Sequence, residues 1–486
     1  MKKLFFFLTI CILSVPAISQ NASDALRYSR IFYGGSARFQ GLAGAMGAVG
    51  GDFSVIATNP GGLGIFKSSE ISITPNIWIG MSQSDYNGTT ANDHKVSFGL
   101  GDLGFVFSIP MDKRHRTGGI KYLNFAFGIN RQNDFNNRIY IQGQNNTSSM
   151  LTDYVNVLNS QPGITPDQIN NQYPFDIALA YNANLIFYDT LHNQYMNDAY
   201  HGGVMQEKSI TTYGSMNEFE FAFGANYNDK LYFGATIGIP YLRYYEHSIY
   251  SEAKTDPTIQ YFQYLSYEQV LETHGVGVNF KAGLIYRPAN WIRIGAAIHT
   301  PTFYGMMRDA WSSNMYAEFE NNSWNNTQYS PAGNYNYALT TPFRAIGSLA
   351  FIIGPYGLIS AEYEYDNYNQ ARFHAQDSFD ATNQDIKDSY KSPLNLRFGT
   401  EWRIWDFRVR GGFGYYGSPY KNDINDGERL LASGGFGYRG KHFYGDLTYV
   451  WTRTTEDYYL YNPELVNPSY NKLYSNSVVM TWGVRF

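Results

Sequence analysis

The chain has 486 residues with 43 Tyr, 33 Phe and 47 Gly, a net charge of -5, and only 16% charged residues. This aromatic and glycine-rich composition, with a negative mean hydropathy of -0.36, favours β structure and excludes bundled membrane helices. The acidic net charge leaves no basic surface, and no arginine-rich or RNP-like motif is present, so nucleic acid is excluded as a partner.

Residues 1–19 have the pattern of a secretory signal peptide. Lysines at positions 2 and 3 precede an apolar stretch at 4–15, and small residues at 17–19 provide a cleavage site, which we place after Ser19. The only cysteine, Cys11, lies inside this segment and lacks the following small residues that lipid modification requires. We therefore expect a secreted chain without disulfides or a thiolate metal site.

A glycine-laden segment follows the signal, and its only charges between residues 34 and 66 are Arg38 and Asp52. The segment is too small to fold around its own core and too apolar to be a solvated tail. It needs an enclosing structure, so residues 20–68 are predicted to form a plug, or hatch, inside a pore.

Two interpretations of the hatch residues remain open. Phe53, Ile56 and Leu63 are candidates for contact with a ligand. Asn59 and Pro60 either set a turn that serves gating, or form an ordinary turn that lets the chain enter the wall. The second role is favoured for Asn59 and Pro60 themselves.

Beyond the signal no apolar stretch is long enough for a transmembrane helix, and period-two alternation dominates instead. Phe219, Phe221 and Phe223, for example, alternate with Glu218 and polar or small residues. Such strands are long enough to cross a bilayer, which needs about 9 to 11 residues per tilted strand. We expect strands near 69–83, 94–110, 120–135, 216–228, 230–250, 266–287, 291–320, 335–353, 355–368, 391–404, 406–417, 428–440, 442–454 and 473–486.

The connections between these fourteen runs alternate strictly between long and short, as in outer-membrane barrels. Residues 69–486 are therefore predicted to form an antiparallel transmembrane β-barrel of about fourteen strands, an all-β fold. Both termini are expected on the short-turn, periplasmic side. The seventh run is interrupted at Thr300-Pro301, and counting it twice gives an odd number of strands.

The longest connection, residues 136–215, is predicted to be an extracellular and partly helical loop. Leu151, Tyr154 and Leu158 have helical spacing and are candidates for external capture of a ligand. The alternative is that this apolar stripe only packs the loop onto the barrel rim.

Two irregularities mark the first two runs. The apolar phase of the second run slips at Gly101-Asp102, which indicates a β-bulge, and Pro75 removes a ladder hydrogen bond from the first run. Together they predict a weak seam between these strands. The seam serves either as a lateral exit or only to curve the wall.

The sequence from Ser36 through Gly50-Gly51-Asp52 to Asn59-Pro60-Gly61-Gly62-Leu63 resembles the N-terminal hatch of the long-chain fatty acid transporter (FadL/TodX) family, especially its Bacteroidetes branch. Members usually have Asn-Pro-Ala-Gly-Leu at the last motif, a change of one small residue. The resemblance implies a fourteen-stranded barrel with a hatch. It also implies passage of hydrophobic molecules across the outer membrane without an energy source, partly through a lateral opening.

No enzyme chemistry is expected. Gly-x-Ser-x-Gly is absent, the nine histidines are scattered, and the lumen-facing His299 alone does not indicate haem, so we expect no cofactor and no metal. Paired lumen carboxylates are expected to form ion pairs with lumen arginines: Glu218 and Glu220, Glu362 and Glu364, with Arg397, Arg403, Arg408 and Arg410.

The predicted function is passive transport of hydrophobic small molecules, such as long-chain fatty acids, across the outer membrane of a Gram-negative bacterium. The route would comprise external capture, a hatch-gated lumen and a lateral exit. The alternatives are a general porin and a surface binding or adhesion barrel. Expected partners are the hydrophobic ligand, outer-membrane lipid and lipopolysaccharide, and the barrel assembly machinery through the strand that ends at Phe486.

Overall fold

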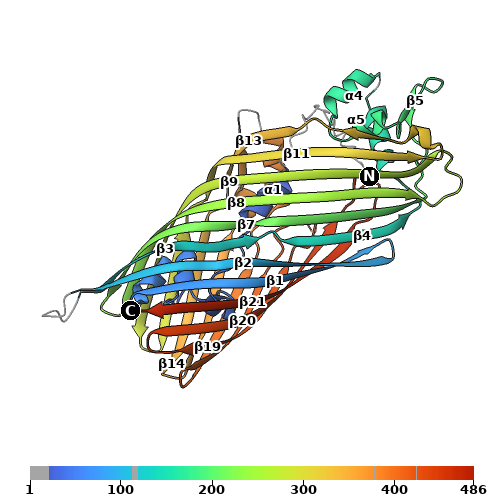
Figure 1. Cartoon of the computed structure of the whole chain (residues 1–486). Coiled ribbons are helices and arrows are strands. Elements are labelled where there is room, and N and C mark those ends of the chain that lie inside the picture. Colours follow the sequence, from blue (N-terminus) through green and yellow to red (C-terminus); the bar gives the residue numbers. More distant parts are fainter. Residues whose placement is uncertain (1–20, 112–118, 162, 376–378, 423) are drawn as a thin grey trace, which may run out of the picture.

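The structure is a computed structural model that describes residues 21–111, 119–161, 163–375, 379–422 and 424–486. The predicted signal peptide lies outside the described residues. Figure 1 shows long inclined strands, with α4, α5 and β5 together at one end of the molecule and the C-terminus at the other.

Nineteen strands form one continuous antiparallel sheet. They are β1 (Glu70–Tyr86), β2 (Thr89–Pro110), β3 (Ile120–Asp134), β4 (Asn137–Asn145), β7 (Val204–Tyr227), β8 (Leu231–Lys254), β9 (Phe262–Ala289), β10 (Ile292–His299), β11 (Phe303–Phe319), β12 (Asn326–Tyr329), β13 (Gly333–Thr340), β14 (Arg344–Ile353), β15 (Gly357–Asp366), β16 (Arg372–His374), β17 (Asn395–Ile404), β18 (Phe407–Tyr416), β19 (Arg429–Arg439), β20 (Phe443–Tyr458) and β21 (Ser469–Arg485).

Pairing between β1 and β21 closes this sheet into a barrel with fourteen strand positions, which confirms the predicted fold class. Four positions hold more than one strand end to end. β3 and β4 both pair with β7, and β10 and β11 both pair with β9. In the next position β14 pairs with β10 while β13 and β12 pair with β11, and beside it β15 pairs with β14 and β16 with β13. The interruption at Thr300-Pro301 therefore divides one strand position and adds none to the count.

The helices lie in the N-terminal part of the chain and in the loops. They are α1 (Ala22–Ser29), α2 (Ala37–Gly41), α3 (Met150–Asn159), α4 (Pro166–Gln172), α5 (Ile177–Asn182) and α6 (Asp380–Ser389), with the 3-10 helices η1 (Phe53–Ala57), η2 (Pro60–Ile65), η3 (Asn322–Trp324) and η4 (Tyr368–Gln370). Two short strands, β5 (Phe187–Asp189) and β6 (Gln194–Met196), form a separate hairpin. No helix within the described residues is long and apolar enough to cross a membrane.

The predicted limits of the long loop, 136–215, are wrong. β4 pairs with β7 from Asn137↔Thr212 to Asn145↔Val204, so the connection between these two strands is residues 146–203. These strand extensions lie toward the long-loop end, where an outward face need not be apolar. The alternation that identified the other strands is therefore weak here.

The two faces of the wall have opposite chemistry. Phe98 and Phe221 on the outer face are 79% and 57% exposed, whereas Glu220 on the inner face is fully buried. Apolar residues that point outward and charged residues that point inward are the reverse of a soluble fold and the pattern of a barrel in lipid.

Residues 21–69, which we call the N-terminal segment, lie inside the barrel. Helix α2 contacts β18 to β21, and η2 contacts β7 to β10 on other parts of the wall. Higher in the lumen, Tyr28 of α1 packs edge-on against Phe135 and Tyr244 of the wall. At the short-turn mouth, Ser69 and Phe486 exchange main-chain hydrogen bonds of 3.1 and 3.0 Å. The segment thus spans the lumen from mid-wall to the mouth where β1 begins.

The lumen carboxylates form buried ion pairs, but not always with the predicted partners. Arg397 is 2.6 Å from both Glu362 and Glu364, as expected. Glu218 and Glu220 instead pair with Lys281 of β9. Arg410 pairs with Glu401 and Asp446, so the expectation that arginines would pair with Glu218 and Glu220 is wrong.

Removing one partner of such a pair leaves a carboxylate buried without compensation. Arg397→Leu should therefore lower the free energy of unfolding by about 3–5 kcal/mol, measured by guanidinium titration of the protein in lipid vesicles. The control is Arg243→Leu at an exposed pair with Glu272, where a loss below about 1 kcal/mol is expected. Equal losses in the two variants would contradict this assignment.

Candidate functional site

An apolar cavity of about 440 Å³ lies among the loops at the long-loop end. Its lining comes from α3, the β5 hairpin, η3, the nearby ends of β9 and β11 and their connections: Leu151, Asn184, Leu185, Phe187, Asp198, Tyr261, Phe262, Phe319 and Trp324. Leu151, Leu185 and Phe262 are buried, whereas Phe187, Tyr261 and Trp324 are 44%, 49% and 48% exposed. The cavity therefore has an apolar floor and an aromatic rim open to solvent.

Buried polar contacts fix the helix that carries Leu151. Glu252, at the end of β8, accepts hydrogen bonds from the main-chain N of Met150 (2.8 Å) and from the Ser149 hydroxyl, at the positive end of α3. Asn462 donates to Asp153 at 2.9 Å, and burial raises the pKa of the Asp153 carboxyl against this hydrogen bond. The strand end and a distant loop thus hold α3 in place.

Of the three predicted capture residues, only Leu151 lines the cavity. Tyr154 and Leu158 lie on the same helix but are buried in the core of the loop region. Their packing agrees with the alternative that the apolar stripe attaches the loop to the rim. The contribution of Leu151 to capture stays a prediction.

The predicted bulge between the first two strands is confirmed, with a register shift between Thr74 and Pro75 opposite Asp102 and Leu100. The β1–β2 ladder nevertheless resumes at Pro75↔Leu100 and continues to Tyr86↔Thr89. The ladder is interrupted instead on the other edge of β2, which faces β3. Among the described residues, β2 pairs with β3 only from Asp102↔Asn130 to Pro110↔Tyr122.

Above Asp102 the two strands separate at lipid depth, since the neighbouring Val96 and Phe98 expose apolar side chains outward. Side chains join the wall again higher up, where Lys95 Nζ donates to the carbonyl of Thr212 at 2.6 Å. Between these levels the Arg131 guanidinium lies against Gly99, where an added Cβ would be 2.6 Å from Nη1. We call this region the β2–β3 break.

The N-terminal segment covers the β2–β3 break from inside. The main-chain N–H groups of Phe32 and Gly34 donate to the carbonyls of Gln132 and Arg131 at 2.8 and 2.9 Å. The carbonyl of Gly35 approaches Gly101, where an added Cβ would lie only 2.7 Å away. Main-chain groups of β3 that lack a β2 partner are thus satisfied by this segment.

A polar contact joins the bulge to the segment. The hydroxyl of Ser54 donates to Asp102 Oδ2 at 2.8 Å and accepts from the main-chain N of Ser36 at 2.7 Å. Ser36 in turn donates to Asp52, whose Oδ1 accepts from the main-chain N of Ser54. All of these side chains are buried, so the segment and the bulge form one closed network.

The other predicted hatch residues pack against the wall. Phe53, Ile56 and Leu63 form one buried cluster with Val106, Ala126 and Ala222. Asn59 caps η2 by accepting from Gly61 N and donates to the carbonyls of Gly47 and Leu284, with Pro60 next to it in the first turn. These contacts agree with the structural role favoured for Asn59 and Pro60, and ligand contact by the other three stays a prediction.

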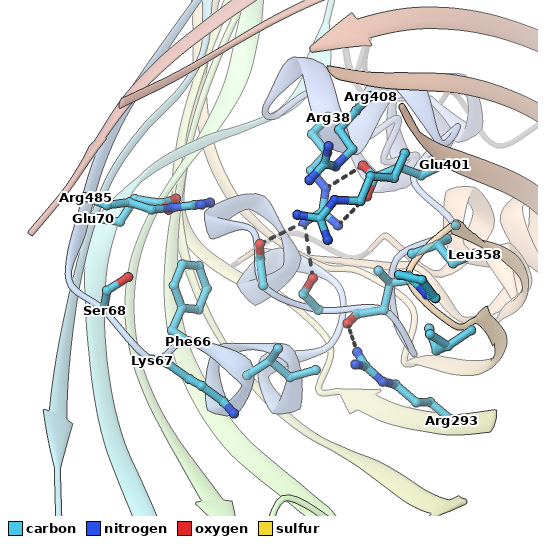
Figure 2. A pocket seen from close by; sticks show the side chains of 18 of the residues that line it. Arg38, Phe66, Lys67, Ser68, Glu70, Arg293, Leu358, Glu401, Arg408 and Arg485 are labelled. Carbon is cyan, nitrogen blue, oxygen red and sulfur yellow. Dashed lines mark hydrogen bonds and ion pairs between the residues drawn. The ribbon is translucent and has the colours of Figure 1, made fainter. Parts of the chain in front are cut away.

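A second cavity, of about 430 Å³, opens beneath the N-terminal segment at the short-turn mouth and is shown in Figure 2. The sides of this cavity come from residues 49–51 and 65–68 of the segment and from strands on opposite parts of the wall. In Figure 2 Arg38 lies beside Glu401, and Arg485 beside Glu70. Charged side chains therefore dominate this cavity, whereas apolar side chains dominate the long-loop cavity.

An inside-out barrel with its lumen filled by its own N-terminal segment defines a closed membrane barrel, and solved structures share this fold. A Pseudomonas aeruginosa FadL homologue matches with a TM-score of 0.53 and 10% identity over 94% of this chain and 99% of that one. The Pseudomonas putida toluene transporter TodX gives 0.52 and 11% over 94% and 99%. The monoaromatic hydrocarbon channel CymD gives 0.50 and 11% over 93% and 98%.

These likenesses confirm the resemblance predicted from the sequence at the level of fold. No protein-family model matches the chain, and no curated protein matches it. Sequence reasoning missed Phe32, Gly34, Arg131 and the aromatic rim residue Trp324. Only the absence of alternation around Arg131 hinted at the β2–β3 break, because contacts between distant segments leave no local pattern.

The aromatic rim predicts how the long-loop cavity binds apolar molecules. Trp324→Ala should weaken binding of the fluorescent apolar probe N-phenyl-1-naphthylamine about tenfold, because a large ring would no longer cover the ligand. The matched control is Tyr329→Ala, an aromatic residue that is 74% exposed and lies outside the lining. A similar affinity for the two variants would show that the probe binds elsewhere.

Proposed function

We propose that this protein is an outer-membrane barrel that passes hydrophobic small molecules without an energy source. The observation that carries the proposal is a break in the wall at lipid depth that the N-terminal segment covers from inside. A closed lumen excludes free diffusion of water-soluble solutes. A covered side opening permits exchange between the lumen and the surrounding lipid.

Capture would begin at the long-loop cavity. Its rim of Phe187, Tyr261 and Trp324 offers an apolar solute a favourable surface outside the membrane, because contact with the rim removes apolar area from water. The buried floor, which includes Leu151, would hold the solute on the side from which the lumen is entered.

Exit would occur through the β2–β3 break. Movement of residues 32–35 away from β3, together with the Arg131 side chain, would uncover the gap above Asp102. The exit expected between β1 and β2 is accordingly proposed one strand further, because pairing between β1 and β2 continues on both sides of the bulge. On this proposal Pro75 and Gly101 shape the part of the wall against which the N-terminal segment packs, and they do not form the opening.

The structural neighbours support an apolar cargo. One is a FadL homologue, one is named a toluene transporter and one a monoaromatic hydrocarbon channel. A fatty acid and a small aromatic hydrocarbon are both compatible with an apolar rim and a lipid-facing exit. On this proposal the long loops and their cavity face outward, and the C-terminal end of β21 faces the periplasm.

Two alternatives make different predictions in transport assays. Uptake of a radiolabelled fatty acid and of toluene should be faster in cells that express the protein than in cells that lack it. If cells with and without the protein take up each compound at the same rate, transport is rejected and a surface binding barrel is favoured. Rapid swelling of proteoliposomes in sugar solutions would instead favour a general porin.

A disulfide can test whether the segment must move. Since the only cysteine is Cys11 in the predicted signal, the variant Ser54→Cys with Asp102→Cys introduces one new pair at a contact of 2.8 Å. Under oxidation, uptake should fall to the level of cells that lack the protein. Uptake should return after reduction with dithiothreitol, because the segment would no longer be linked to the wall.

The control cross-link joins two wall strands. Thr452 and Ser475 place their hydroxyl oxygens 2.6 Å apart between β20 and β21, so Thr452→Cys with Ser475→Cys should oxidise without loss of uptake. Full uptake by the oxidised Ser54→Cys, Asp102→Cys variant would mean that the segment does not gate the route.

A further inference from the structure

The short-turn cavity has an excess of positive charge. Six cationic side chains line it, against two acidic ones. The cationic residues are Arg38, Lys67, Arg293, Arg403, Arg408 and Arg485.

Both carboxylates of the cavity are already engaged. Glu401 lies 2.9 Å from Arg38 and 2.6 Å from Arg410, a buried residue of the wall. Glu70 lies 2.8 Å from Arg485 and accepts a hydrogen bond of 2.7 Å from the Tyr444 hydroxyl. Neither carboxylate is left to neutralise the remaining arginines.

Three arginines have no carboxylate within 4 Å among the described residues: Arg293, Arg403 and Arg408. Arg403 and Arg408 face each other directly across β17 and β18, an arrangement of like charges that destabilises a sheet unless an anion intervenes. Arg408 donates to the carbonyls of Trp405 and Phe407. The Nε of Arg293 is buried and has no hydrogen-bond partner in the part of the chain that the structure describes.

Apolar side chains also line the cavity on two sides. Ile65 and Phe66 of the N-terminal segment lie on one side, and Ile352 and Leu358 of the β14–β15 hairpin contribute on the other. A guanidinium presents parallel N–H groups that match the two oxygens of a carboxylate or phosphate. A ligand with an oxyanion head and a short apolar chain would satisfy both parts of this cavity, whose volume is in the range of small-molecule sites.

We propose that the short-turn cavity is a second ligand site that binds an organic oxyanion, a carboxylate or phosphate attached to an apolar chain, through Arg293, Arg403 and Arg408. The anion is either a transported molecule or the headgroup of a lipid from the adjacent leaflet. Binding of an anion in the short-turn cavity does not depend on transport, but a role of this cavity in transport rests on the proposed function.

Occupancy of this site would act on the N-terminal segment from below. Arg38 donates to the carbonyl of Gly51 at 2.8 Å, and Arg293 donates to the carbonyl of Val49 at 2.7 Å. An anion on Arg293 competes with the carbonyl of Val49, one of the two contacts that hold the base of the segment. Binding at the short-turn mouth is therefore expected to loosen the same segment that covers the β2–β3 break.

The test is calorimetric titration of the purified full chain, in a non-ionic detergent, with hexanoate, hexyl phosphate and hexanol. All three carry an unbranched alkyl tail of five or six carbons, and hexanol lacks the charge. The wild-type protein should bind at least one of the two anions about tenfold more tightly than hexanol, and this preference should decrease at high salt. Arg403→Gln with Arg408→Gln should abolish the preference, as should Arg293→Met.

Arg243→Gln, an exposed arginine at the other end of the barrel, is the charge-matched control and should leave the preference unchanged. Trp324→Ala should also leave it unchanged, because that residue lines the long-loop cavity and not the short-turn cavity. Tighter binding of hexyl phosphate than of hexanoate would support the site with a lipid headgroup as its source. Tighter binding of hexanoate would support it with a transported acid.

Equal affinity for the anions and hexanol in the wild-type protein would overturn the proposal, and so would a preference that survives in Arg403→Gln with Arg408→Gln. Uptake assays on the same preparations separate this result from the proposed function. If the protein supports uptake but shows no preference for the anions over hexanol, the anion site is rejected and the proposed function stands. Anion preference without uptake rejects transport and leaves the site.

Discussion

A main-chain N–H or C=O group at lipid depth must have a partner, because lipid supplies none. Closure of β1 on β21 meets this requirement around most of the wall. Between β2 and β3 the ladder ends at Asp102↔Asn130, and Phe32 and Gly34 donate to the carbonyls of β3 instead. The N-terminal segment is therefore part of the wall as well as a filling of the lumen, and any movement of it changes both.

The two cavities differ in chemistry and lie at opposite ends of the barrel. The long-loop cavity is aromatic and half open, which suits capture of apolar solutes from water. The short-turn cavity collects arginines, of which Arg38 and Arg293 hold carbonyls of the segment. The N-terminal segment thus has an apolar site above it, a cationic site below it and a break in the wall at its side.

The membrane-spanning wall could be predicted from the sequence because lipid and lumen impose opposite chemistry on alternate residues. Phe219, Phe221 and Phe223 show this alternation without any knowledge of their neighbours. The extensions β4 and the start of β7 lie where that constraint ends, so the loop limits were wrong. The bulge at Gly101 was visible as a phase slip. The unpaired edge of β2 above this bulge was not visible in the sequence, because the pairing of β2 with β3 is a property of the closed barrel. The same limit explains why Lys281 was not recognised as the partner of Glu218.

Closure of the lumen by the N-terminal segment is the central claim, and planar-bilayer conductance tests it directly. The wild-type protein should show no steady ion conductance. A variant that lacks residues 21–66 but retains the wall should conduct steadily, because the helices of the segment that fill the lumen would be absent. Steady conductance of the wild-type protein at the level of this variant would contradict the account.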